Sequence, residues 1–456
     1  MSGRFTIDFD WLPRETGSIE ERATFAEVRV NVDGKSLIDL EDLRAKTVRS
    51  AMRISAYHLA LWFAANWWRL HHEPERKTCD WRLSHCLAAA GGGYSWPNLT
   101  FVGDGQFLTI QATASKPGTD PHDAGSGPPA PGWRSPGGPI EPVRYLTESI
   151  CQIPVESFTE EVDSFVGAVI ERLKTMGHDD NDLARLWDEV NEERRLARLV
   201  AWRRLEAILG CEPGDAAEEV MRRLGEEADR VGICALEEVA AADPVRTLGV
   251  LESFQRDLRP RAIPVRIPHQ EAVRQEWMTR IDPHTLPWQR AEIAARLARS
   301  AWGLHPGPLG DEALIDTFSL QGTTFSEHPD AVGETFGAGF RDFDGATGEI
   351  GVYLNRRPGT GRRFAFARLI ADHLFSASPQ DRLLPASDAA TNRQKFQRAF
   401  AQEFLCPFDP LMEFFGSGLL TDDRIEMAAE YFAVSPLLVK TTLVNRGVLT
   451  RTALLG

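Results

Sequence analysis

A segment rich in proline and glycine, SKPGTDPHDAGSGPPAPGWRSPGGPIEP at residues 115–142, sets the strongest limit on how this chain folds. A hydrophobic core cannot be built from such a composition, because it offers few side chains to bury. Strand-like patterns precede the segment, and helical patterns follow it. We therefore expect a disordered insertion here, within an N-terminal α+β domain that spans residues 1–155.

Alternating apolar and polar residues predict short strands in this N-terminal domain. The alternation covers Phe5–Trp11 and Ala23–Val32, and an Asp-Gly turn signal follows the second of these. A further strand pair is predicted over Leu99–Ala112, with its turn at Gly103–Gly105. The sequence of Leu40–Leu70 reads as one long helical region, apolar enough to lie in the middle of a fold.

Helical periodicity dominates the rest of the chain. Apolar residues recur at helical spacing over about Glu156–Ala241, and Asn181 or the aspartates before it can cap a helix. Proline punctuates the end of this region, and Trp288–Trp302 is again an amphipathic helix. We expect a multidomain α+β protein, with a mainly helical middle region at residues 156–287 and a C-terminal domain at residues 288–456.

The charge balance argues against a general nucleic-acid-binding surface. The formal net charge is −15 and the pI is about 5.3, whereas phosphate contacts need a basic face. Nucleic acid would have to be bound through a local basic patch or within a complex.

A cytoplasmic setting without a membrane is expected. The start, MSGRFTIDFDWLP, lacks the basic-then-apolar order of a signal peptide. The most apolar stretch, Ile54–Leu70, falls short of the roughly 20 clean residues needed to span a bilayer. The six cysteines include no CxxC pair, so neither a disulfide scaffold nor a zinc ribbon is indicated.

Five segments in the last third of the chain follow one another in a recognisable order. They are AEIAARLARSAWGLHPGPLGDEALIDTFSL, GEIGVYLN, RRFAFARLIADHL, FQRAFAQEFLCP and AAEYFAVSPLLVKTTLVNRGVL. This order, over about residues 288–449, resembles that of the ImmA/IrrE family of metallopeptidase-like proteins. The resemblance implies a zincin-like α+β domain with a helical tail, built around a zinc-binding helix and a second helix that carries the third ligand.

The positions that would hold zinc carry other residues in this chain. A zinc peptidase needs two histidines one helical turn apart and a glutamate beside the first as general base. The resemblance places these three positions at Arg368, Leu369 and Asp372, and the third ligand at Gln394. A cation repels zinc, leucine accepts no proton, and an amide is a poor ligand. We predict a degenerate peptidase domain without a catalytic residue or cofactor.

Nearby residues do not replace the missing ligands easily. His373 points about 100° away from Asp372 on a helix, and Glu403 lies on nearly the opposite helical face from Gln394. Arg368 and Asp372 are expected to form an i,i+4 salt bridge in place of the metal. A rebuilt zinc site remains the alternative. The expected binding-cleft residues are Arg368, Asp372, His373, Gln394 and Glu403.

A second His/Cys group lies in the sequence LHHEPERKTCDWRLSHC. Its members are His71, His72, Cys79, His85 and Cys86. No pair has CxxC or HxxxH spacing, so a helix end followed by a turn is favoured over a metal site.

The C-terminal segment Ile425–Leu449 scans as helix, turn and helix, which resembles a helix-turn-helix. Its second helix offers Lys440, Asn445 and Arg446 as polar readers of DNA. A DNA-binding regulator is therefore one alternative function.

The favoured function is that of a non-catalytic, peptidase-like protein that binds a protein or peptide. The resemblance implies a prokaryotic regulatory, stress-response or defence role. The other alternative is an active zinc metallopeptidase with displaced ligands.

Overall fold

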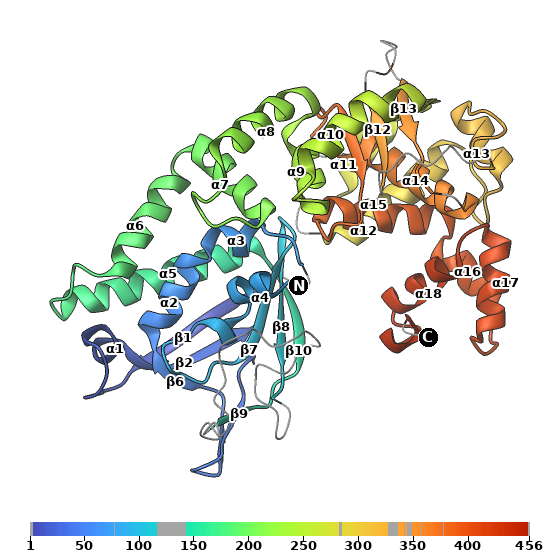
Figure 1. The fold of residues 1–456 in the computed structure, drawn as a ribbon. Helices are drawn as coiled ribbons and strands as arrows, with labels where there is room; N and C mark the ends of the chain where they lie inside the picture. Colours follow the sequence, from blue (N-terminus) through green and yellow to red (C-terminus); the bar gives the residue numbers. More distant parts are fainter. Residues whose placement is uncertain are drawn as a thin grey trace. The chain divides into compact units, whose positions relative to one another are not determined.

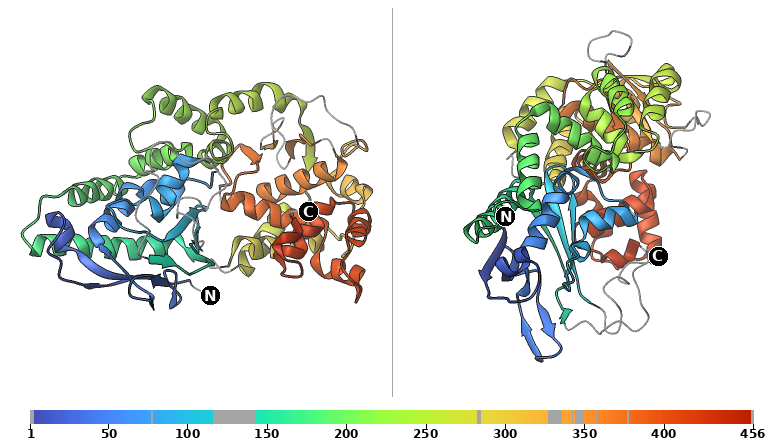
Figure 2. Two further views of the ribbon diagram at one scale, coloured as in Figure 1. Left: turned by 60° about the horizontal axis from the view of Figure 1, so that its bottom comes forward. Right: turned by 60° about the vertical axis from the view of Figure 1, so that its left-hand side comes forward.

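The computed structural model of the chain describes residues 3–76, 78–115, 143–281, 285–326, 336–341, 343, 349–356, 358–376 and 378–454. It confirms the multidomain α+β fold, since α-helices alternate with several small antiparallel sheets. Two compact units divide the chain, Met1–Ala216 and Ala217–Gly456. Figure 1 shows the first in blue to green and the second in green to red, and Figure 2 gives two further views.

Antiparallel strands form three sheets in the first unit. In the largest, β2 (Phe25–Val32) pairs with β1 (Phe5–Trp11), β3 (Lys35–Ser36) and β6 (Met52–Ser55). The other strands are β4 (Leu40–Asp42), β5 (Thr47–Arg49) and β9 (Val143–Tyr145) in one sheet, and β7 (Asn98–Gly103), β8 (Phe107–Thr113) and β10 (Ser149–Pro154) in another.

Helices of the first unit cover these sheets. They are α1 (Ile19–Ala23), α2 (Ala56–Ala65), α3 (Trp67–His72), α4 (Cys79–His85), α5 (Val155–Thr175), α6 (Asp182–Arg194) and α7 (Ala197–Leu209). The long helix α5 packs against β1 and α2 (Figure 1). Phe5 of β1, Phe63 of α2 and Phe158 of α5 meet in the core with Phe101 of β7.

The expectation of one helix over Leu40–Leu70 is wrong. Three short strands occupy its first half, and the helix begins at Ala56. Met52 and Ile54 pair across to β2, a partner that lies far back in the sequence. The helix also breaks at Asn66, whose side-chain amide donates to the Trp62 carbonyl at 2.8 Å and ends α2.

The second unit is built on a four-stranded antiparallel sheet in the order β11-β13-β12-β14. The strands are β11 (Ile263–Arg266), β13 (Glu349–Tyr353), β12 (Gly337–Phe340) and β14 (Leu383–Ala386). The helices are α8 (Glu218–Val231), α9 (Ile233–Ala242), α10 (Thr247–Ser253), α11 (Gln270–Arg280), α12 (Pro287–Ala301), α13 (Asp311–Phe318), α14 (Gly359–Phe375), α15 (Asn392–Leu405), α16 (Phe408–Phe415), α17 (Asp422–Phe432) and α18 (Pro436–Asn445).

The central helix of the second unit is α14. It packs against α15 and against β12 and β14, and most of its side chains, including Phe366 and Leu369, are buried. Phe366 contacts Phe318 and Phe325, and Phe400 of α15 stacks on Phe404. A helix buried all round can present polar side chains to its neighbours only where those neighbours supply partners.

The helical stretch expected at residues 156–287 is divided between the two units. Its first helices, α5 to α7, belong to the first unit, and α8 to α11 belong to the second. The reason lies in packing, because α5 completes the first core while β11 pairs with β13. The predicted insertion at 115–142 lies outside the described residues except for Ser115.

Within the described residues, no individual helix is both long and apolar enough to span a membrane. One bent pair of helices, α17 with α18, has sufficient length and apolar content when the two are taken together.

Candidate functional site

The positions that the resemblance assigned to a metal lie close together in the second unit. Thr391 caps α15 by accepting from the Gln394 backbone N–H at 3.3 Å, which starts the helix beside α14. The Arg368 guanidinium donates to the side-chain oxygen of Gln394 and to the Ser387 carbonyl. Arg368 is 3% exposed and Gln394 is 0% exposed. Two of the expected ligand positions therefore bond to each other.

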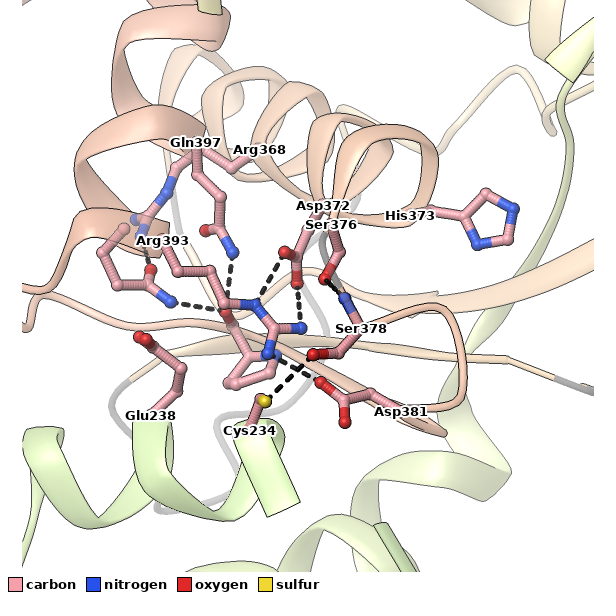
Figure 3. A network of polar contacts seen from close by, with 12 residues as sticks. Cys234, Glu238, Arg368, Asp372, His373, Ser376, Ser378, Asp381, Arg393 and Gln397 are labelled. Carbon is pink, nitrogen blue, oxygen red and sulfur yellow. Dashed lines mark hydrogen bonds and ion pairs between the residues drawn. The ribbon is translucent and has the colours of Figure 1, made fainter. Parts of the chain in front are cut away.

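Asp372 has a different partner from the one that its helical spacing predicts. Arg393 of α15 donates to both of its carboxylate oxygens at 2.8 Å, and to Asp381 Oδ2 at 2.9 Å (Figure 3). The expected ion pair between Arg368 and Asp372 is thus replaced. Burial acts to lower the pKa of Arg393, but the attraction of Asp372 outweighs it and raises that pKa. Arg393 stays charged.

Two further buried carboxylates surround Arg393. Glu238 of α9 accepts a hydrogen bond from Thr391 Oγ1 at 2.8 Å, and burial raises the pKa of Glu238. Burial also raises the pKa of Asp381, whose Oδ1 has no hydrogen-bond partner among the described residues. Asp381 lies against Gly232, where a Cβ atom would collide with that oxygen. These acids make Arg393 the central cation of the cluster.

Side chains also donate hydrogen bonds to carbonyl groups along β14, the last strand of the sheet. The Pro385 carbonyl accepts from the side-chain amides of Gln394 at 2.9 Å and Gln397 at 3.1 Å. Arg368 donates to the Ser387 carbonyl, two residues farther along the chain. Pro385 has no N–H that could donate to an added strand. A peptide could not add itself to this strand without displacing these side chains.

Two of the remaining expected positions are Leu369 and Glu403, and both have partners away from the cluster around Arg393. Leu369 is fully buried in the core. Glu403 points away from Gln394, as its spacing predicts, and pairs with Arg296 at 2.8 Å and Arg446 at 3.6 Å. Neither residue reaches the cluster around Arg393, so neither restores the missing chemistry.

His373 lies on another face of α14 and points away from Asp372 (Figure 3). Its Nδ1 accepts from Arg341 Nε at 3.3 Å, so Nε2 carries the proton and donates to Gln270 Oε1 at 3.0 Å. Burial, reinforced by the positive charge of Arg341, lowers the pKa of His373 to about 4. The ring is therefore neutral near pH 7.

A pocket of about 140 Å³ opens beside His373. It is lined by Gln270, Glu271, Arg274, Arg341, His373, Leu374 and Pro379. Sequence reasoning named His373, whose neighbour Leu374 lies on the same helix. It missed the other lining residues because they come from α11, from the end of β12 and from the loop after α14. It also missed Arg393, for which adjacency to Gln394 was the one available signal.

The His/Cys group of the first unit is not assembled as a metal site. His71 bonds to the Trp67 carbonyl at 2.7 Å and to Thr159 at 2.9 Å, and His85 contacts the carbonyls of Trp81 and Arg69. His72 stacks on Trp68, Cys86 Sγ contacts Asn98 Oδ1, and Cys79 is exposed. Within the described part of the chain, no three His, Cys, Asp or Glu side chains converge as metal ligands.

The predicted helix-turn-helix corresponds to α17 and α18. Lys440 pairs with Asp422 at 2.8 Å and Arg446 pairs with Glu292 at 2.8 Å, so each of these cations has a carboxylate partner, while Asn445 is exposed. α17 exposes four acidic side chains, Asp422, Asp423, Glu426 and Glu430. This charge distribution does not favour contact with phosphates.

Comparison of the chain with protein-family models, with curated proteins and with solved structures finds no significant match.

Proposed function

We propose that this chain is a non-catalytic protein that acts by binding another protein or a peptide. One observation carries the proposal: the side chains at the four positions that a zinc peptidase would need are buried and engaged with their neighbours. Arg368 bonds to Gln394, Asp372 bonds to Arg393, and Leu369 is packed in the core. Arg368 and Leu369 can neither bind zinc nor accept a proton from water, and the Gln394 amide is a poor zinc ligand. The Asp372 carboxylate is already held by Arg393 through both of its oxygens.

The resemblance to the ImmA/IrrE family belongs to this proposal. Arg368, Asp372 and Gln394 come from two helices and lie close together, which is the arrangement that the resemblance implies for a relic of its metal site. A prokaryotic regulatory, stress-response or defence role follows from the same resemblance. All six cysteines are free, which agrees with a reducing cytoplasm.

The binding surface that we propose differs from the cleft expected from the sequence, although both belong to the second unit. Of the five cleft residues predicted from sequence, Arg368, Asp372, Gln394 and Glu403 are buried and bonded, whereas His373 lines a pocket. A partner would therefore contact the His373 side of α14 and the first turns of α11, and the relic positions would hold the two helices together.

Two measurements on the full chain test this function. Metal analysis by mass spectrometry, before and after chelation, is expected to find far less than one zinc per chain. Polypeptides that co-purify from the native host are to be identified, purified and titrated against the chain by calorimetry, with saturable binding expected. One zinc per chain together with chelator-sensitive peptide cleavage would overturn the proposal, as would the absence of any polypeptide that binds after purification.

A further inference from the structure

The pocket beside His373 contains an arginine, Arg274, that forms no ion pair with any described residue. We propose that this pocket binds a carboxylate group, of the kind that ends a polypeptide or that acidic side chains carry. The inference deepens the proposed function and rests on it, since the carboxylate would belong to the bound polypeptide.

Arg274 of α11 is the principal donor. Its side chain is partly exposed, and it has no hydrogen-bond acceptor or ion-pair partner among the described residues. Glu271, three positions before it on the same helix, does not pair with it. A guanidinium presents parallel N–H groups that match the two oxygens of a carboxylate. Arg274 is therefore free to form such a pair with a ligand.

Arg341 adds a second, fixed positive charge to the pocket wall. Its N–H groups donate to backbone carbonyls of Asp372, His373, Ser378, Pro379 and Asp381 and to the His373 ring. These carbonyls hold the guanidinium in place, and no carboxylate of the described residues forms an ion pair with it. A neutral His373 leaves the local charge positive.

Gln270 is oriented as a further donor by the hydrogen bonds around it. Arg341 donates to His373 Nδ1, which fixes the ring proton on Nε2. That proton faces the side-chain oxygen of Gln270. The side-chain amide nitrogen of Gln270 carries two N–H groups. These have no acceptor among the described residues, so they can donate to a ligand oxygen.

The size and the rim of the pocket select the class of anion. A pocket of about 140 Å³ has room for a carboxylate with its first carbons. Glu271 is exposed at the pocket wall and repels a phosphate dianion more strongly than a carboxylate monoanion. Leu374 and Pro379 offer apolar contacts to the carbons of the ligand.

The test uses N-acetylglycine, which carries a C-terminal carboxylate on a peptide-like group, and N-acetylglycinamide, its neutral counterpart. Melting temperatures of the full chain are measured against the concentration of each at constant ionic strength, which gives an apparent Kd. N-acetylglycine is expected to raise the Tm in a saturable way, and the amide is expected to leave it unchanged.

Three variants make the expectation specific. Arg274→Gln should weaken N-acetylglycine binding at least about tenfold, because the charged hydrogen bonds are lost. Glu271→Gln should strengthen it, because a negative charge leaves the pocket wall. Arg280→Gln is the control, since Arg280 lies on the same helix but is exposed and pairs with Glu276; its Kd should match that of the wild type.

If all variants bound N-acetylglycine with the same Kd, or if N-acetylglycine did not raise the Tm of the wild type, the proposal would be overturned. Phosphate binding that exceeds N-acetylglycine binding and requires Arg274 would overturn the assignment to a carboxylate. The outcome is separable from the proposed function, which depends on metal content and on a polypeptide partner. If N-acetylglycine binds and no partner does, the pocket assignment stands and the proposed function fails.

Discussion

The Arg393 guanidinium holds the Asp372 carboxylate through two parallel hydrogen bonds, each 2.8 Å long. This pair joins α15 to α14 inside the core of the second unit, since Asp372 is 2% exposed. A buried ion pair contributes little net stability over an apolar pair. Removing one partner, however, leaves the other charge unpaired in a medium of low polarity. The pair therefore restricts how the two helices can move apart.

Replacing Arg393 should destabilise the chain strongly. We expect Arg393→Ala to lower the free energy of unfolding by about 3–5 kcal/mol, because Asp372 and Asp381 lose their shared cation. Urea unfolding measures the effect. Arg280→Ala, which removes one partner of an exposed pair, should leave the urea midpoint unchanged within error. Similar midpoints for the two variants would contradict the central role of Arg393.

Restoring the ligand chemistry tests the resemblance directly. We expect the variant with Arg368→His, Leu369→Glu, Asp372→His and Gln394→Glu to bind about one zinc per chain, because positions 368, 372 and 394 lie close together. Metal analysis after dialysis measures the content, and the wild type is the control. A folded variant, verified by circular dichroism, that takes up no zinc would argue against a relic metal site.

Gly232 allows Asp381 to lie close to the backbone. Gly232 has φ +98°, and a Cβ atom there would collide with Asp381 Oδ1. Gly232→Ala should therefore lower the free energy of unfolding by more than about 1 kcal/mol, which is measured as a lower melting temperature. The matched control is Gly225→Ala in the exposed middle of α8, where nothing lies near the new methyl group. That variant should gain about 0.5–1 kcal/mol from helix propensity. Equal effects would refute the close contact.

The buried His71 should make the stability of the first unit depend on pH. Burial lowers the pKa of His71 to about 4, whereas it is near 6.5 in the unfolded chain. The unfolded state thus binds more protons between these values, so the contribution is complete above pH 6.5 and is lost as the pH falls toward 4.

The His71→Gln variant isolates this contribution. The difference in unfolding free energy between the wild type and the variant should shrink by about 2 kcal/mol from pH 8 to pH 5. Urea titrations at both pH values measure it. A difference that stays constant with pH would mean that the pKa of His71 is the same in the folded and unfolded chains.

Elements whose stabilising contacts are local could be predicted from the sequence. Periodic apolar residues predicted α5 and α12, since backbone hydrogen bonds in a helix join residues four positions apart, and the family resemblance implied α14 and α15. The Asn181 cap is equally local, because its side chain accepts from the Ala184 N–H at 2.9 Å. The change of chemistry at Arg368 and Gln394 could also be read from sequence, once the resemblance had aligned them.

The partners of these residues depend on the tertiary structure. The strand β6 was missed because its pairing with β2 joins distant segments, and no local pattern encodes such a pair. Spacing on one helix suggested Asp372 as the partner of Arg368, yet the fold brings Arg393 to Asp372 and Gln394 to Arg368. Ion pairs and pockets depend on which elements pack together, so their members come from α9, α11, α14 and α15 and become neighbours only after the chain has folded.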